Sequence, residues 1–211
     1  WQEIEIIGWL YQFYISERKD EVIGSVVAKE DIPAATQLFT PKWIVRYMVE
    51  NSLGRLWLES HPDSSLKTKM PFFIENPDDA KAGSREKQFD TPEEIRCIDD
   101  ACGSGHILVY KFDILYEMYA ECGYPQSEIP SLILKNNLYG LDIDERAVQL
   151  ATFALMMKAR EKDKRFLGRG ILPHVLAVQE SNSIDLDSLL NVGVANTAHL
   201  SPLRNPTKLM D

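Results

Sequence analysis

The stretch "IRCIDDACGSGHILVYKFDILYEMYAECG", from Ile95 to Gly123, contains the features that decide the fold of this chain. It begins with a short apolar run that ends in two aspartates, passes two glycines and continues directly into an amphipathic segment. The first part predicts a strand from Ile95 to Asp99, and the second predicts a helix from Gly105 to Cys122. A strand that turns through glycines into a helix leaves backbone N–H groups at the turn, where a ligand can bind.

The alternation of strands and helices continues after this stretch. A short helix is expected from Ile129 to Leu134, followed by a strand from Leu138 to Asp142. Asp144 then suits the N-cap of a further helix, and "HVLAVQ", from His174 to Gln179, predicts a third strand. This order is typical of a parallel sheet with right-handed crossovers. We therefore expect a doubly wound, Rossmann-like α/β fold that is incomplete in this chain, with the parallel sheet between helices.

The part of the chain before Ile95 differs in character and predicts two further segments. Residues 1–58 read as helical, with an apolar stripe and then a helix in which Thr40 is the N-cap and Pro41 the first residue. Residues 59–94 are rich in Pro, Asp, Lys, Ser and Gly, which predicts a polar linker or insertion around "MPFFI". Residues 95–211 form the predicted α/β half-domain. The expected inward faces of the two N-terminal helices are Ile7, Leu10, Tyr11 and Tyr14, and Ile44, Val45, Met48, Val49, Ser52 and Leu56.

The composition excludes several classes of protein. The 211 residues are 45% hydrophobic, which is ordinary for a soluble domain. The net charge of −9 argues against tight binding of nucleic acid by this chain alone. The three cysteines lack the C-x-x-C spacing of zinc sites, so we expect free, mostly buried thiols and no metal. We see neither a bilayer-spanning apolar run nor a signal peptide, and expect a cytoplasmic protein without membrane contact.

Polar residues stand at the predicted strand ends, where α/β sheets bind ligands. Gly103 and Gly105 allow a close backbone approach, the following helix N-terminus favours an anionic group, and Asp99 suits an ammonium. Together they indicate an amino-acid moiety rather than a pyrophosphate, although a tight turn alone also requires glycine. Asp142 suits a ribose diol, but an exposed acid at a strand end is an equally simple interpretation.

Two further features concern the adenine and the choice of cofactor. Asn182 offers both a donor and an acceptor to an adenine edge, although a turn explains "SNS" equally well. The loop "DDACGSGHIL" lacks the third glycine of G-x-G-x-x-G, because Ile107 stands in its place. A nicotinamide-dependent oxidoreductase is therefore the least favoured alternative.

Three motifs in one order carry a family resemblance. "DDACGSGHIL" resembles the D-P-A-C-G-S-G loop of S-adenosylmethionine-dependent DNA adenine-N6 methyltransferases, "LYGLDIDERAVQLA" resembles their second motif, and "FTPKWIVRYMVE" resembles their upstream Thr-Pro motif. The chain is most similar to the PglX-type methyltransferases of bacteriophage-exclusion systems and to related type II restriction-modification enzymes. The resemblance covers residues 36–186.

The resemblance implies S-adenosylmethionine as the cofactor and assigns a part of it to each motif. Asp100 departs from the family, which commonly has proline there, and it adds a charge beside the cradle. The implied contacts are Thr40 and Pro41 at the methionine end, a cradle of Asp99, Ala101, Gly103 and Gly105, Asp142 on the ribose hydroxyls, Ile143 against the adenine ring and Asn182 at the adenine edge.

The family's catalytic motif, N/D-P-P-Y/F, does not occur in these 211 residues. "RNPTKLMD" at Asn205 has Thr207 for the second proline and Lys208 for the aromatic residue, and "ENPDD" at Asn76 precedes the cofactor loop. We therefore assign no catalytic residue in this chain and expect it to be inactive alone. DNA would bind through parts of the parent protein not present here, and partner subunits of a defence system are a further expectation.

Other functions remain open on the sequence alone. A catalytically dead module could use the same fold as an S-adenosylmethionine sensor or as a partner surface. An RNA or protein methyltransferase would share the cofactor loop and differ in its catalytic motif. The residues that follow the third strand in the parent protein would distinguish them.

Overall fold

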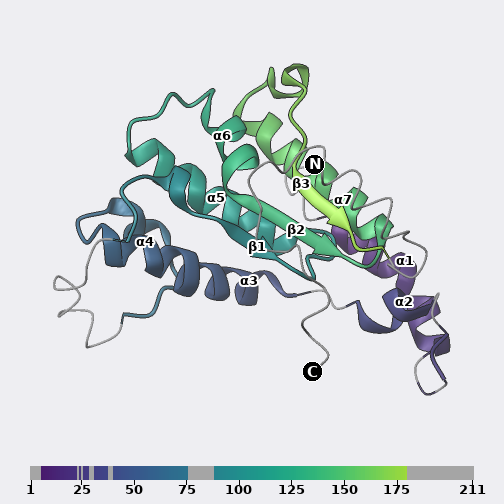
Figure 1. Ribbon diagram of the computed structural model, residues 1–211. Coiled ribbons are helices and arrows are strands. Elements are labelled where there is room, and N and C mark those ends of the chain that lie inside the picture. Colours follow the sequence, from purple (N-terminus) through teal and green to yellow (C-terminus); the bar gives the residue numbers. More distant parts are fainter. Residues whose placement is uncertain are drawn as a thin grey trace, which may run out of the picture. The chain divides into compact units, whose positions relative to one another are not determined.

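A three-stranded parallel sheet lies at the centre of the described structure (Figure 1). In this computed structural model the strands β1 (Cys97–Asp99), β2 (Leu138–Asp142) and β3 (His174–Ala177) are neighbours in that order. The register pairs Asp99 with Gly140 and Asp142 with Ala177. The predicted Rossmann-like α/β fold is confirmed. The structure describes residues 6–22, 24, 26–28, 31–37, 40–75 and 88–179.

Helices connect the strands and precede them. The crossover from β1 to β2 contains α5 and α6, and the crossover from β2 to β3 contains α7. Both α5 and α7 contact β2, and they contact each other. The helices are α1 (Ile6–Val22), α2 (Ile32–Thr36), α3 (Lys42–Val49), a π-helical segment (Glu50–Gly54), α4 (Arg55–Ser60), α5 (His106–Glu121), α6 (Ile129–Asn136) and α7 (Glu145–Lys162), with short 3₁₀ helices at Ser65–Lys69, Pro92–Glu94 and Phe166–Arg169.

The two faces of the sheet differ in how they are covered. Side chains alternate along a strand, and β2 buries Leu138, Gly140 and Asp142 on the face that α5 and α7 cover. On the opposite face, Ile98 and Leu176 are 62% and 64% exposed in the part of the chain that the structure describes. Among the described residues, α5 and α7 therefore cover one face of the sheet, and Ile98 and Leu176 are exposed on the other.

A glycine in the central strand sets the distance between the sheet and α5. A Cβ atom at Gly140 would lie 2.8 Å from Cδ1 of Leu108 and 3.2 Å from both Sγ of Cys102 and Cγ1 of Val175. Because interiors are close-packed, no side chain fits there without displacing its neighbours. Gly140 thus brings the first turn of α5, and with it the loop after β1, close to the end of β2.

The helix around residues 42–60 contains a wider turn that the sequence did not indicate. Its buried hydrophobic side chains are Val45, Val49, Leu53 and Trp57, which follow one another at intervals of four residues. The segment Glu50–Gly54 is π-helical. The predicted face was correct for Val45 and Val49 and wrong for Met48 and Ser52, which are exposed. A straight α-helix repeats every 3.6 residues, and the wider turn shifts the inward face.

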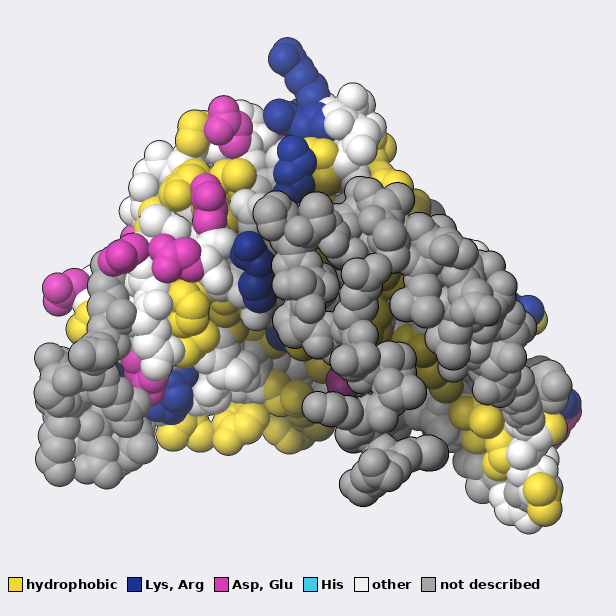
Figure 2. Space-filling model, in the orientation of Figure 1, with side chains coloured by type: hydrophobic (Ala, Val, Ile, Leu, Met, Phe, Trp, Pro, Cys, Tyr) yellow, Lys and Arg dark blue, Asp and Glu magenta, His cyan; other side chains and the backbone are white. Residues whose placement is uncertain are grey.

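The start of α3 and its outer face also differ from expectation. Pro41, rather than Thr40, is the N-cap residue: its backbone is extended, its carbonyl accepts from the N–H groups of Ile44 and Val45, and no side-chain cap is formed. Figure 2 shows hydrophobic side chains along the lower edge of the view, where α3 lies in Figure 1. Trp43, Tyr47 and Met48 of α3 are exposed large hydrophobic residues.

The predicted inward face of α1 is wrong for Leu10 and Tyr14. Both side chains are exposed, whereas Gly8 and Ile15 are buried and Tyr11 is half-buried; the side chain of Ile7 lies outside what the structure describes. Because glycine has no side chain, Gly8 does not contribute to the hydrophobic pattern. The pattern of α1 therefore predicts an inward face that lies one position before the face that contacts the loop.

Part of the predicted linker packs against the core. Leu66 and Met70 are buried in the same hydrophobic cluster as Trp57 of α4 and Leu115 of α5. Glu50, which is fully buried, accepts from the N–H of Phe72 at 2.6 Å and thereby fixes the "MPFFI" segment. The described residues up to Val178 belong to one compact unit, and the boundaries at residues 58 and 94 stay predictions. Asn76, Asn182 and Asn205 lie outside the described residues.

Candidate functional site

The ends of β1 and β2 meet around the glycine loop. Asp142 is buried at the end of β2, where its Oδ2 accepts from the N–H of Gly103 at 2.7 Å and its Oδ1 accepts from the N–H of Asp144 at 2.9 Å. The N–H of Cys102 donates to the carbonyl of Leu141 at 2.9 Å. A carboxylate offers about four acceptor sites, so Asp142 retains lone pairs for ribose hydroxyls after binding both N–H groups.

Asp99, at the end of β1, has one carboxylate oxygen without a partner. Its Oδ1 accepts from the N–H of Ala101 at 3.4 Å, a long contact, while Oδ2 is buried and has no hydrogen-bond partner in the described structure. Burial raises the pKa of Asp99; Lys111 opposes this shift, and Asp100 and Asp142 add to it. A buried polar atom without a partner is unusual in a folded protein and indicates a place for a ligand donor.

Both glycines of the loop have left-handed backbones, for two different reasons. Gly103 has φ of 52°, and a Cβ atom there would meet nothing within 4 Å, so its surroundings are open to a ligand. Gly105, the N-cap residue of α5, has φ of 87°, and a Cβ atom would lie 2.9 Å from Cβ of Ala151. The first glycine therefore opens the cradle, and the second packs α5 against α7.

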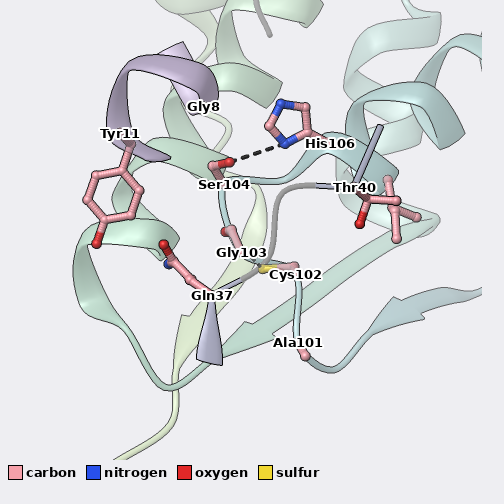
Figure 3. Close-up of a pocket in the computed structure, with 10 residues that line it drawn as sticks. Gly8, Tyr11, Gln37, Thr40, Ala101, Cys102, Gly103, Ser104 and His106 are labelled. Carbon is pink, nitrogen blue, oxygen red and sulfur yellow. Dashed lines mark hydrogen bonds between the residues drawn. The ribbon is translucent and has the colours of Figure 1, made fainter. Parts of the chain in front are cut away.

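A cavity of about 70 Å³ lies beside this loop (Figure 3). Pockets that enclose a drug-sized ligand begin at roughly 300 Å³. The cavity therefore suits one end of a cofactor, such as an amino-acid part, and not a whole nucleoside. Its lining consists of the predicted residues Thr40, Ala101 and Gly103 together with Gly8, Tyr11, Gln37, Cys102, Ser104, His106 and Ile107.

The remaining predicted residues lie outside this lining. Asp99 and Asp142 are linked to it through the loop, because they bond to the N–H groups of Ala101 and Gly103. Ile143 directly follows Asp142, the last residue of β2, and its side chain is 55% exposed. Pro41 and Gly105 act through the backbone at the starts of α3 and α5. Hydrogen bonds thus bring the ends of β1 and β2, at Asp99 and Asp142, together at one loop.

Sequence reasoning missed four polar residues of the cavity. Ser104 and His106 stand in the glycine loop, and Oγ of Ser104 lies 3.2 Å from Nδ1 of His106 (Figure 3). Their positions, between and directly after the two glycines, are a local signal in the sequence. Tyr11 of α1 and Gln37, which follows α2, carry no such signal, because only the tertiary structure brings them to the loop.

The electrostatics of the site favour a cationic ligand. Burial, and to a lesser extent the carboxylates of Asp99 and Asp142, raise the pKa of the Cys102 thiol to about 12. Cys102 is therefore a protonated thiol and not a nucleophile. Acids at both strand ends would repel a pyrophosphate and attract a positively charged group, which agrees with an ammonium or sulfonium ligand.

The three cysteines, all within the described ranges, form no disulfide. Cys102 is buried, Cys97 is half-buried and Cys122 is exposed, so the thiols are less buried than expected. No cluster of three or more His, Cys, Asp or Glu side chains that could hold a metal ion occurs among the described residues. Within the same residues, no helix combines the length and apolar character needed to cross a bilayer.

The parallel sheet and the acid-flanked glycine loop define the class as a Rossmann-like α/β domain. Residues 74–199 match the model of the MmeI DNA-methyltransferase domain. The chain belongs to this family of DNA-methyltransferase domains.

Curated relatives match most of the chain. The adenine-specific methyltransferase BrxX of Escherichia coli O9:H4 (strain HS) is 54% identical over 186 residues, which cover 86% of this chain and 15% of that protein. The adenine-specific methyltransferase PglX of Lacticaseibacillus casei (strain Zhang) is 43% identical over 195 residues, covering 87% of this chain and 16% of the relative. The chain thus spans about a sixth of the length of these relatives.

A solved structure is also similar. The type IIL restriction-modification enzyme MmeI, in complex with DNA, aligns with 92% of this chain and 25% of its own chain, with 18% identity and a TM-score of 0.46.

Proposed function

We propose that this chain is the cofactor-binding part of an adenine-specific DNA methyltransferase that transfers a methyl group from S-adenosylmethionine to N6 of adenine. The observation that carries the proposal is the convergence of Asp99, Gly103 and Asp142 at the ends of neighbouring parallel strands, with Oδ2 of Asp99 buried and without a hydrogen-bond partner among the described residues. Membership of a DNA-methyltransferase domain family supports the reaction class.

The residues present fit S-adenosylmethionine part by part. The ammonium of its amino-acid end would donate to Asp99, and its carboxylate would accept from N–H groups at the start of α5, beside Ser104 and His106. The ribose hydroxyls would donate to the remaining lone pairs of Asp142, and the adenine ring would lie against the exposed Ile143. Asn182 is proposed at the adenine edge. When bound, the cofactor supplies a methyl group on a sulfonium as the electrophile.

The work of this chain is then binding and orientation. Asp142 holds the loop through the N–H of Gly103 and the helix start through the N–H of Asp144, so the cradle is organised before a ligand arrives. Such preorganisation places the reacting group without an ordering cost at the time of reaction. The polar and aromatic residues that would hold a flipped adenine are not found in this sequence, so we expect no methyl transfer by the chain alone.

The whole protein's substrate and partners follow from the same proposal. The net charge of −9 supports the proposal that the main DNA contacts lie in other parts of the parent protein, because phosphate binding requires clustered Lys and Arg. We also propose partner subunits of a phage-defence system and a location in the cytoplasm.

Calorimetric titration of the 211-residue chain tests the proposal. We expect measurable, weak binding of S-adenosylmethionine, no binding of NAD, and loss of the binding on Asp142→Ala. Binding of NAD in preference to S-adenosylmethionine would overturn the proposal. Incorporation of labelled methyl into unmodified DNA by the isolated chain, abolished by Asp142→Ala, would overturn the expected inactivity.

A further inference from the structure

Asp144 joins three elements that are distant in the sequence. Its Oδ1 accepts from the N–H of Arg146 at 2.9 Å and caps α7, as the sequence predicts. Its Oδ2 accepts from the hydroxyl of Tyr11 on α1 and from Nε2 of Gln37, the latter at 3.1 Å. Capping α7 requires only Oδ1, so the two contacts to Oδ2 need a separate explanation.

The contacts to Asp144 continue into the glycine loop. The N–H of Asp144 donates to Asp142, which in turn accepts from the N–H of Gly103 at 2.7 Å. A continuous series of hydrogen bonds therefore connects Tyr11 of α1 with the loop that is proposed to hold the cofactor. Hydrogen bonds to a carboxylate are among the stronger ones in proteins.

A glycine brings α1 into direct contact with that loop. A Cβ atom at Gly8 would lie 2.2 Å from Cε1 of His106 and 2.7 Å from Oγ of Ser104. The backbone of α1 therefore lies directly on the residues that line the cavity, one turn before Tyr11. Figure 3 shows the side chains of Tyr11 and Gln37 on the same side of the view, and both donate to Oδ2 of Asp144.

We propose that Tyr11 and Gln37 are positioning residues for S-adenosylmethionine: through Asp144 they hold α1 and the segment leading to Thr40 over the amino-acid end of the cofactor. This inference rests on the proposed function. Tyr11 and Gln37 line the cavity together with Thr40 and the loop residues Ala101, Cys102, Gly103 and Ser104, so residues from both sides of the sequence contribute to its wall. Burial and the hydrogen bond to Asp144 both raise the pKa of Tyr11, which therefore remains a neutral donor at physiological pH.

Two ligands separate positioning from a merely structural role. S-adenosylmethionine carries the amino-acid end, whereas 5′-methylthioadenosine has the nucleoside and thioether without it. For Tyr11→Phe and for Gln37→Met we expect about tenfold weaker binding of S-adenosylmethionine by titration calorimetry, and binding of 5′-methylthioadenosine unchanged within about twofold. A general loss of structure would weaken both ligands equally.

Matched controls come from the same elements. Tyr14→Phe removes a hydroxyl from the same helix at a side chain that is 68% exposed, and we expect it to bind both ligands like the original chain. Asp144→Asn retains a good N-cap residue for α7. The double variant Asp144→Asn with Tyr11→Phe should weaken S-adenosylmethionine binding no further than either single change does.

The outcomes separate the inference from the proposed function. Unchanged affinity for S-adenosylmethionine in both Tyr11→Phe and Gln37→Met, or an equal loss for both ligands, would overturn the positioning role and leave the proposed function standing. Failure of the unaltered, folded chain to bind either ligand would overturn both.

Discussion

Oδ2 of Asp142 and the backbone nitrogen of Gly103 lie 2.7 Å apart, so the last residue of β2 holds the loop that follows β1. Because the two residues are 39 positions apart in the sequence, this contact exists only when the strands pair in parallel register. The same carboxylate is proposed to bind ribose hydroxyls, and cofactor binding and loop order are therefore coupled through one side chain.

Replacement of Asp142 by asparagine tests this coupling. An amide has one acceptor oxygen, so either Gly103 or Asp144 loses its partner, and we expect the free energy of unfolding to fall by about 1 to 3 kcal/mol. Affinity for S-adenosylmethionine should fall at least about tenfold as well. Thermal unfolding and calorimetry measure the two effects. The control is Asp100→Asn, which alters the exposed acid next to Asp99 and should leave the free energy of unfolding unchanged. An equal loss of stability in Asp142→Asn and Asp100→Asn would contradict the coupling.

Gly140→Ala should destabilise the chain through overpacking. The added methyl group would meet Leu108, Cys102 and Val175 at 2.8 to 3.2 Å, and forcing a methylene into a packed core costs about 1 to 3 kcal/mol. Urea unfolding followed by circular dichroism measures the change. Gly168→Ala is the matched control, because its Cβ atom would meet nothing within 4 Å. If Gly140→Ala and Gly168→Ala lose the same free energy of unfolding, α5 does not pack tightly against β2 at Gly140.

The pair Gly105→Ala and Gly123→Ala separates backbone strain from steric contact. Both glycines have left-handed backbones, with φ of 87° and 83°, so both changes carry a similar conformational cost of about 1 kcal/mol. Only at Gly105 does the added Cβ also meet Ala151, at 2.9 Å. We expect Gly105→Ala to be the more destabilising of the two in the same unfolding measurement. If the two losses are equal, the packing of α5 on α7 does not depend on Gly105.

Asp99→Asn should stabilise the chain at neutral pH and weaken cofactor binding. Burial raises the pKa of Asp99 above its ordinary value of 3.8, so the folded state favours the protonated, uncharged form. The stabilisation that the Asp99 carboxyl contributes to the folded state is therefore fully present below pH 3.8. It is lost as the pH rises through the raised pKa of this group. The variant carries no charge at this position at any pH.

The measurement is the difference in unfolding free energy between the variant and the original chain from pH 7 to pH 4. This difference should favour the variant at pH 7 and shrink on acidification, while S-adenosylmethionine affinity at pH 7 falls about tenfold. A difference that is constant across the pH range would show that Asp99 is not the titrating group. Retained affinity would remove Asp99 from the proposed contact with the ammonium.

Local patterns were sufficient for the sheet and its crossovers. The apolar run before Asp99, the glycine turn and the periodicity of Leu108, Phe112 and Leu115 act over a few residues, so β1 and α5 were predictable within two residues at their ends. The N-cap role of Asp144 was predictable for the same reason, because its side chain bonds to an N–H two residues away.

What the sequence by itself determined is the order of strands and helices and the residues that stand at the strand ends. Only the tertiary structure decided which face α1 buries, where the helix around residues 42–60 widens, and that Tyr11 and Gln37 meet Asp144 beside the loop. The physical reason is that a hydrophobic pattern records side-chain burial along one element. Close backbone approach at Gly8 and shared hydrogen bonds between distant residues depend on how the elements pack, and they leave no periodic trace in the sequence.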